Sequence, residues 1–253
     1  MGSRELRLSC AETDRVDWPL PGEGDSRPGA VAVLVAATLS ELRAHRKRFE
    51  AILDDEELER AARFRFEPDR ERYILGHGML REVLGRHVDA DPAMLRFARG
   101  PYGKPIIHGS DLHFNFSDTK DAVLVGTSTV AELGVDLETM HRQVDHDAVA
   151  DHYFTPKEID ALNRAAGSER KRRFLELWTR KEAVLKACGI GLMDDLKELS
   201  VLDGINALRI THPGFMHVAA PTYHLRTWRL SDSHLISLAA PRPMSASLER
   251  YSP

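Results

Sequence analysis

The sequence lacks the features by which several classes of protein are recognised. Its two cysteines, Cys10 and Cys188, lie far apart in the chain, and they are too few for a disulfide framework or a cysteine-based zinc site. The first residues contain no apolar core of a signal peptide, and the best hydrophobic run, residues 30–39, is too short to span a bilayer. We therefore expect a cytoplasmic protein without a membrane role.

Neither sign of charge dominates. The 253 residues include 35 Lys and Arg and 39 Asp and Glu, which gives a formal net charge of -4, and 42% of the residues are hydrophobic. This composition is ordinary for a folded globular protein and excludes simple disorder. It provides no general field that would attract nucleic acid. At this length, one large domain and two small domains are both plausible.

Helical and strand patterns come in separate blocks. In the first half, helical spacing over residues 54–87, divided by Pro68, precedes three strand patterns at residues 106–108, 113–117 and 122–127. In the second half, a helix over residues 169–186 precedes four strand patterns at residues 199–202, 208–211, 223–229 and 235–239. Segregated helices and strands predict an α+β fold.

We expect four segments along the chain. They are an irregular N-terminal lead-in (1–29), an α+β half (30–130), a second α+β half (131–241) and a loose tail (242–253). The lead-in is inferred from its Asp, Pro, Gly and Glu content and its weak periodicity, and the tail from its terminal position.

Two acidic residues lie close together in the strand pattern over residues 134–138. Alternate side chains of a strand share a face, so Asp136 and Glu138 project together. Like charges that close are unfavourable unless a cation lies between them, and a divalent cation with oxygen ligands is the usual solution. The same pattern also fits an ordinary strand with acids that face solvent.

A third acidic residue lies on the helix predicted over residues 169–186. Trp178, Glu182 and Lys186 fall on one stripe at a spacing of four. A surface Glu–Lys pair beside a packed tryptophan explains this spacing. An inward Trp178, however, brings both charges toward the interior, where they need a metal, a phosphate or each other.

Basic residues form another group. Arg60, Arg63, Arg70 and Arg72 lie on the paired helices, and Lys104 lies in a Gly-Lys-Pro turn. Arg and Lys near turns and helix ends suit phosphate binding, although each one alone is more often a solubilising side chain.

The strand pattern at residues 113–117 has one polar face, formed by His113, Asn115 and Ser117. This face meets either a ligand or water.

Together these elements resemble a known family. Gly134-Val135-Asp136-Leu137-Glu138, followed by Trp178-Thr179-Arg180-Lys181-Glu182-Ala183-Val184-Leu185-Lys186-Ala187, resembles the two-motif pattern of the larger, single-chain (Sfp-type) 4'-phosphopantetheinyl transferases. Similar segments upstream are Arg63-Phe64, Asp69 to Tyr73, Gly103-Lys104-Pro105 and His113 to Ser117. The resemblance therefore covers roughly residues 55–190.

The resemblance implies a monomer of two similar α+β halves related by a pseudo-twofold axis, with coenzyme A and Mg²⁺, or Mn²⁺ in its place, bound in the cleft between them. By similarity, Asp136, Glu138 and Glu182 ligate the metal. We expect Glu182 and Lys186 to be the catalytic residues: Glu182, or a water it holds, accepts the serine proton, and Lys186 steadies the α-phosphate and the leaving group.

The resemblance also assigns a set of residues to coenzyme A: Arg60, Arg63, Arg72, Lys104, Ser117, Asp118, Asp136 and Lys186. One position departs from the family pattern. The family usually has a histidine after the serine, in contact with the 3'-phosphate, whereas this chain has Asp118. A carboxylate there repels the phosphate unless it is protonated or turned away.

The implied reaction transfers the 4'-phosphopantetheine arm of coenzyme A to a serine of an acyl or peptidyl carrier protein and releases 3',5'-ADP. The expected partners are thus coenzyme A and carrier proteins, with no nucleic acid and no membrane. Two alternatives stay open: a metal-dependent nucleotide pyrophosphohydrolase, and a non-catalytic protein that binds coenzyme A or a carrier.

Overall fold

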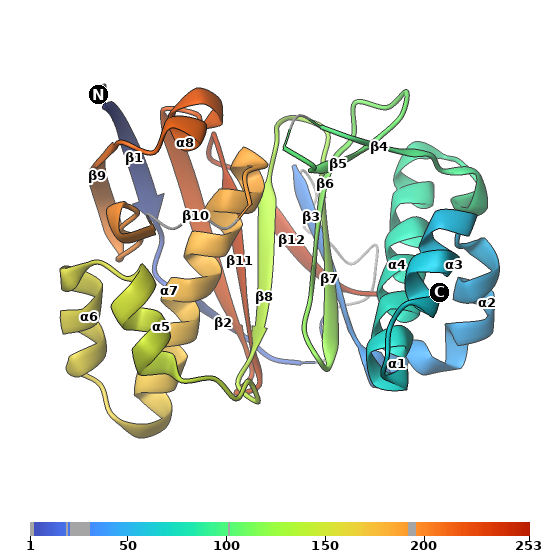
Figure 1. The fold of residues 1–253 in the computed structure, drawn as a ribbon, viewed down its shortest axis with the longest axis horizontal. Coiled ribbons are helices and arrows are strands. Elements are labelled where there is room, and N and C mark those ends of the chain that lie inside the picture. Colours follow the sequence, from blue (N-terminus) through green and yellow to red (C-terminus); the bar gives the residue numbers. More distant parts are fainter. Residues whose placement is uncertain (1–2, 19, 21–30, 101, 192–195) are drawn as a thin grey trace.

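The computed structural model describes residues 3–18, 20, 31–100, 102–191 and 196–253. A six-stranded sheet and a four-stranded sheet lie side by side, and each carries helices on one face (Figure 1). The predicted α+β class is confirmed. Within the described ranges, no helix combines the length and the apolarity that a bilayer crossing requires.

The four-stranded sheet belongs mainly to the first half of the chain. Its strands, in spatial order, are β12 (Ala246–Arg250), β3 (Ala32–Thr38), β7 (Ala122–Ser128) and β6 (His113–Asp118). The helices on it are α1 (Leu39–Leu42), α2 (Arg46–Ile52), α3 (Asp55–Ala62) and α4 (Glu67–Val88). A separate small ladder pairs β4 (Phe97–Arg99) with β5 (Pro105–Ile107).

Helix α4 is the longest helix of this half. Pro68 lies in its first turn, where the missing amide hydrogen costs no helical hydrogen bond, so Pro68 separates α4 from α3 as predicted. The helix ends at Asp89, which adopts a left-handed conformation with φ 50°. Its buried Ile74 and Met79 belong to the core that also contains Val35 and Val125 of the sheet.

The six-stranded sheet belongs mainly to the second half. Its main path is β8 (Gly134–Thr139), β11 (His234–Ala240), β10 (Thr222–Leu230), β1 (Arg4–Cys10) and β9 (Gly204–Ile210), and β2 (Asp14–Val16) also pairs with β10. Its helices are α5 (His146–Tyr153), α6 (Pro156–Asn163), α7 (Gly167–Cys188) and α8 (Pro213–Val218).

Helix α7 packs against β8 and β11. It ends at Gly189, whose φ of 72° is the left-handed conformation that glycine adopts readily. Gly134 permits the close approach, because a Cβ at this position would overlap the carbonyl oxygen of Ala183 and the amide nitrogen of Ala187. This glycine therefore sets how near the side chains of α7 come to those of β8.

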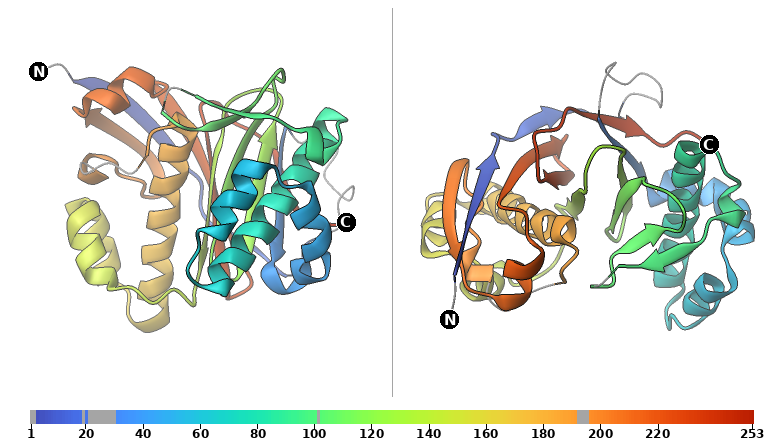
Figure 2. Two further views of the ribbon diagram at one scale, coloured as in Figure 1. Left: turned by 45° about the vertical axis from the view of Figure 1, so that its right-hand side comes forward. Right: turned by 90° about the horizontal axis from the view of Figure 1, so that it is seen from above.

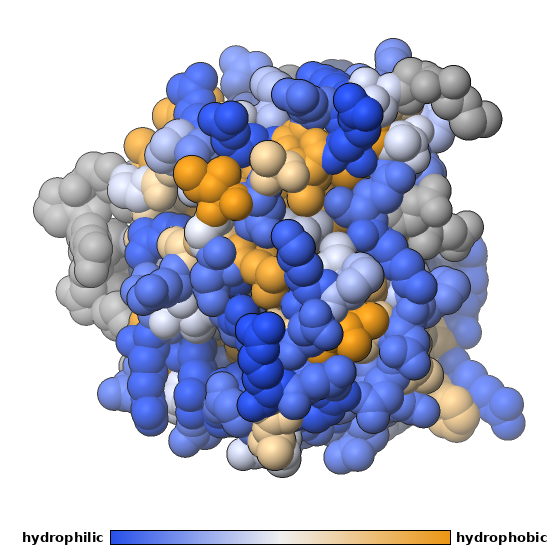
Figure 3. Space-filling model, turned by 90° about the vertical axis from the view of Figure 1, so that its left-hand side faces the viewer, coloured by the Kyte–Doolittle hydropathy of each residue, from blue (hydrophilic) through white to orange (hydrophobic). Residues whose placement is uncertain are grey.

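The outer edge of the six-stranded sheet is β9, which pairs with β1. Most of its side chains are exposed, including Ile205 at 73%. Figure 3, seen from this side of the molecule, shows hydrophilic residues surrounding separate hydrophobic areas. Charged residues such as Arg209 on an edge strand discourage pairing with another chain.

Three sequence-based expectations differ from the structure. The expected lead-in contains β1, whose Leu6, Leu8 and Cys10 alternate toward the core, so residues 4–10 are not irregular; most of residues 19–30 lie outside the described part. The expected loose tail contains β12, which pairs in parallel with β3. No strand forms at residues 199–202, where Leu199 and Val201 instead enter the core beneath α7.

The two halves bury apolar surface against each other. A third core joins Leu34 and Leu124 of the four-stranded sheet with Val135 and Ile236 of the six-stranded sheet. Figure 2 shows how the two sheets meet along their neighbouring strands. The site described next lies along this junction.

Candidate active site

A cavity of about 730 Å³ lies between the halves. It is formed by α4, β6 and the turn after β6 from one half, and by β8, the turn after β8 and α7 from the other. Seven of the predicted site residues line it together: Arg72, Ser117, Asp118, Asp136, Glu138, Glu182 and Lys186.

The polar face of β6 contacts the edge of β8 through Asn115 and Ser117, and Ser117 also lines the cavity. The Asn115 side-chain oxygen accepts a hydrogen bond from the Val135 amide at 2.9 Å, and Ser117 Oγ accepts one from the Leu137 amide at 3.1 Å. These bonds satisfy backbone donors at a buried junction between two sheets. They also hold β8 on both sides of Asp136.

Asp136 is buried, with 6% of its surface exposed. Its Oδ1 accepts hydrogen bonds from Lys186 Nζ at 2.7 Å and from Ser117 Oγ at 3.0 Å. Its Oδ2 is buried without a hydrogen-bond partner among the residues that the structure describes. A buried carboxylate oxygen in this condition is costly unless a further ligand binds it.

Glu138 is paired with Arg142, which lies in the turn after β8. The Arg142 guanidinium also lies 5.6 Å from the centre of the Trp178 ring, within reach of a cation–π interaction. Trp178 is buried, as the sequence predicts.

Glu182 is the third carboxyl group. Burial and then the negative charge of Asp136 raise its pKa to about 7, although Lys186 and Arg142 act in the opposite direction. Such a value suits a group that takes up and releases a proton near neutral pH.

Asp118 forms an ion pair with Arg72 at 2.9 Å, and Arg72 also contacts Asp69 at 3.0 Å. Burial raises the pKa of Asp118, and the positive charges of Arg72 and Lys186 oppose that shift. The carboxylate that replaces the family histidine is therefore paired within the cavity rather than turned away.

Three predicted residues lie outside the cavity lining. Arg60 lies over the Tyr73 ring at 5.8 Å, and the exposed Arg63 pairs with Glu59 at 3.4 Å. Lys104 donates to the Leu133 carbonyl at 2.9 Å and pairs with Glu132. The coenzyme A contacts proposed for these three residues stay predictions.

Sequence reasoning missed two cations in the cavity, Lys120 and Arg142. Both lie in short turns directly after strands that carry predicted site residues, and this position is the signal that could have found them. Lys120 Nζ donates to the His141 carbonyl at 2.8 Å.

The residues of the cavity suit a divalent metal by their chemistry. The carboxylates of Asp136, Glu138 and Glu182 line it, and Oδ2 of Asp136 has no hydrogen-bond partner among the described residues. As the side chains lie, no three acidic, histidine or cysteine groups converge as a ligand cluster within the described ranges. Two of the carboxylates are instead held by Lys186 and Arg142, so a metal would take the place of these internal cations.

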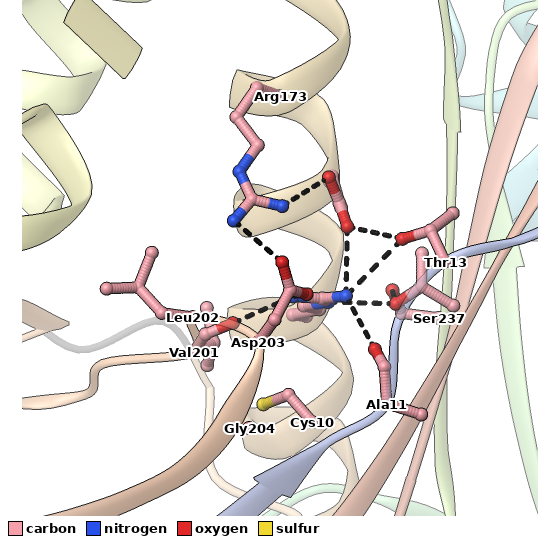
Figure 4. A network of polar contacts seen from close by, with 12 residues as sticks. Cys10, Ala11, Thr13, Arg173, Val201, Leu202, Asp203, Gly204 and Ser237 are labelled. Atoms are coloured by element: carbon pink, nitrogen blue, oxygen red, sulfur yellow. Dashed lines mark hydrogen bonds and ion pairs between the residues drawn. The ribbon is translucent and has the colours of Figure 1, made fainter. Parts of the chain in front are cut away.

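Two other charged residues of the segment Trp178–Ala187, Arg180 and Lys181, stabilise α7. Arg180 is fully buried and bonds Thr227 Oγ1 at 3.0 Å, Asp203 Oδ1 at 2.8 Å and the Ala11 carbonyl at 2.9 Å. Figure 4 shows this network, which ties the first strands of the chain to α7. Lys181 and Glu158, both buried, pair at 2.9 Å. Neither Arg180 nor Lys181 lines the cavity.

A cavity lined by carboxylates and cations suits a divalent metal and the phosphates of a nucleotide. Comparison with known proteins defines the class further. Residues 132–239 match the model of the 4'-phosphopantetheinyl transferase superfamily, and residues 42–130 match that of the 4'-phosphopantetheinyl transferase N-terminal region.

Individual relatives agree with these models. A putative 4'-phosphopantetheinyl transferase of Synechocystis sp. is 32% identical over 192 residues, 75% of each chain. The transferase HetI of Nostoc sp. is 33% identical over 173 residues, 67% of this chain and 70% of HetI. Sfp of Bacillus subtilis is 27% identical over 202 residues, 78% of this chain and 86% of Sfp. The chain belongs to the 4'-phosphopantetheinyl transferase superfamily and is a transferase of this type.

Proposed function

We propose that this enzyme transfers the 4'-phosphopantetheine arm of coenzyme A to a serine of an acyl or peptidyl carrier protein and releases 3',5'-ADP. The observation that carries the proposal is the convergence of Asp136, Glu138, Glu182 and Lys186 in one cavity between two halves that both match this family. The carboxylates suit a metal and the cations suit a pyrophosphate.

The chain's own residues perform two tasks in this reaction. Glu182, or a water it holds, accepts the proton of the carrier serine as the serine oxygen forms a bond to the β-phosphorus of coenzyme A. The bond from that phosphorus to the bridging oxygen breaks, and 3',5'-ADP leaves with the electron pair. Lys186, released from Asp136, stabilises the charge on the leaving phosphate.

Asp136, Glu138 and Glu182 are the residues that would hold Mg²⁺, or Mn²⁺ in its place. A bound metal would supply charge stabilisation and orientation of the pyrophosphate. Arg72, Ser117 and Lys186 are the best-placed contacts for the nucleotide phosphates, because all three line the cavity.

We further propose that the two halves, built mainly from residues 30–130 and 131–241, are related by a pseudo-twofold axis, and that the enzyme acts as a monomer. Each half contains a 22-residue helix, α4 or α7, packed on a sheet. One chain supplies both walls of the cavity. The two free cysteines agree with a cytoplasmic setting.

Mass spectrometry of a panel of apo carrier proteins, incubated with the enzyme, coenzyme A and Mg²⁺, tests the reaction. We expect a phosphopantetheine adduct on one serine and an equal amount of 3',5'-ADP. Release of 3',5'-ADP without a carrier would instead indicate a pyrophosphohydrolase. Binding of coenzyme A without any product would indicate a non-catalytic protein.

A further inference from the structure

The turn between β6 and β7 carries part of the cavity wall. Asp118, Thr119 and Lys120 all line the cavity, and the next residue, Asp121, does not. Turns between strands are mobile unless other contacts hold them. Asp121 provides such contacts to both halves of the molecule.

The Asp121 carboxylate accepts three hydrogen bonds. Oδ1 accepts from Thr119 Oγ1 at 2.8 Å and from His234 Nε2 at 3.2 Å, and Oδ2 accepts from Thr139 Oγ1 at 3.0 Å. Because a carboxylate only accepts, His234 donates this bond from its Nε2–H. Thr119 belongs to the turn itself, whereas Thr139 ends β8 and His234 begins β11 in the other half.

Further bonds extend this contact. The Asp121 carbonyl accepts from the Leu39 amide at 2.8 Å, at the start of α1. His234 is buried, and its Nδ1 lies 2.8 Å from Ser233 Oγ. Burial alone raises the pKa of Asp121, but its hydrogen bonds and the charge of His234 lower that pKa well below the usual range. The carboxylate is therefore ionised at neutral pH.

We propose that Asp121 is a positioning residue for coenzyme A binding: held by His234 and Thr139, it fixes residues 118–120 against the cavity. This inference rests on the proposed function. Besides the Asp121 contacts that hold its turn, Lys120 is held directly: its ammonium donates at 2.8 Å to the His141 carbonyl in the turn after β8. Loss of the Asp121 contacts leaves Lys120, the cation of this turn, without a fixed position in the cavity, and so weakens the binding of a polyanionic nucleotide.

Isothermal titration of coenzyme A into Asp121→Ala and Asp121→Asn, together with steady-state kinetics, tests this role. We expect Asp121→Ala to raise both the dissociation constant and the KM of coenzyme A about tenfold, with kcat changed less than about threefold. Asp121→Asn keeps an acceptor for His234 and should raise the dissociation constant and the KM of coenzyme A only about threefold. Asp232→Ala, in the exposed turn between β10 and β11, is the matched control and should bind as the wild type does.

His234 gives an independent measurement if Asp121→Ala fails to fold. His234→Gln retains an N–H donor and should bind coenzyme A nearly as tightly as the wild type. His234→Ala should bind coenzyme A about as weakly as Asp121→Ala does. Unchanged coenzyme A binding in folded Asp121→Ala or His234→Ala overturns the inference. A wild-type enzyme that binds coenzyme A but modifies no carrier overturns the proposed function instead, so the two failures are distinguishable.

Discussion

The ammonium nitrogen of Lys186 lies 2.7 Å from Oδ1 of Asp136, across the boundary between α7 and β8. The two side chains neutralise each other in the metal-free protein. A metal on Asp136 would compete with this ion pair and free Lys186 for a phosphate.

This pair predicts opposite effects of two substitutions on metal affinity. Asp136→Ala should lose Mn²⁺ binding and transfer, whereas Lys186→Ala should bind Mn²⁺ at least as tightly as the wild type. Lys186→Ala should still lose about 10²–10³ in kcat, the usual effect of removing one charge-stabilising group. Electron paramagnetic resonance of free Mn²⁺ measures the first property. Full turnover by Asp136→Ala in excess metal would refute the metal assignment.

Arg142 should compete with the metal for Glu138, because it pairs with this carboxylate. We expect Arg142→Gln to tighten Mn²⁺ binding by roughly tenfold, the effect of about 1.4 kcal/mol. Lys120→Gln is the control. It removes a cation of the same cavity, but this cation donates to the His141 carbonyl and not to Glu138. Equal effects of both substitutions would show that only the net charge of the cavity matters.

Trp178 emission should respond to Mn²⁺ in the wild type and not in Arg142→Gln, because Arg142 lies over that ring.

Glu182 should make the metal-free protein sensitive to pH. Its pKa of about 7 in the folded state exceeds the ordinary 4.5, so the folded protein binds more protons than the unfolded chain between these values. The free energy of unfolding should therefore fall as the pH rises from about 4.5 to about 7 and then level off. Denaturant unfolding at a series of pH values measures this slope, which Glu182→Gln should remove.

Metal binding gives a second measurement of the same group. At pH 6, loading with Mn²⁺ should release roughly one proton in the wild type, because the ligand must be deprotonated. Titration calorimetry in buffers of different ionisation enthalpy detects this proton. A release that persists in Glu182→Gln would assign it to another group.

Asp118 should weaken the binding of coenzyme A, because its carboxylate occupies Arg72 and repels phosphate. We expect Asp118→Asn to lower the KM of coenzyme A roughly three- to tenfold, in the range of about 1 kcal/mol for a partly exposed charge. Asp69→Asn is the control, because it removes the other acidic partner of Arg72 and does not line the cavity. A higher KM in Asp118→Asn would mean that this residue mainly orders Arg72.

Lys181 should matter for stability rather than for catalysis. It pairs with Glu158 at full burial, so Lys181→Met leaves an uncompensated charge and should cost about 3–5 kcal/mol of unfolding free energy. Urea unfolding measures the change, and coenzyme A binding by the remaining folded protein should stay normal. Lys157→Met, on the exposed side of α6, is the control and should leave stability unchanged.

Local patterns predicted much of the fold. Pro68 separates two helices as expected, Gly189 ends α7 close to the predicted end of that helix, and Thr155 caps α6 with a reciprocal bond from Glu158. The strands β1 and β12 were missed because their pairing partners lie at the far end of the chain, and short edge patterns carry little signal alone.

The site was predictable where one element carries several functional groups. The spacing of Asp136 and Glu138 on a strand, and of Glu182 and Lys186 on a helix, placed all four in the cavity. The contacts of Asn115 and Asp121 could not be predicted, because each reaches across the junction to a strand of the other half. Partners of this kind depend on tertiary packing, which no local periodicity reports.

The strands at the two ends of the chain are exchanged between the halves. β1 lies in the sheet of the second half, beside β10, and β12 lies in the sheet of the first half, beside β3. Neither half is therefore a continuous stretch of sequence, and a cut at residue 130 would separate each half from one of its own strands. The four-stranded sheet is complete only when β12 has been added at its edge, although β12 follows every strand of the six-stranded sheet in the chain.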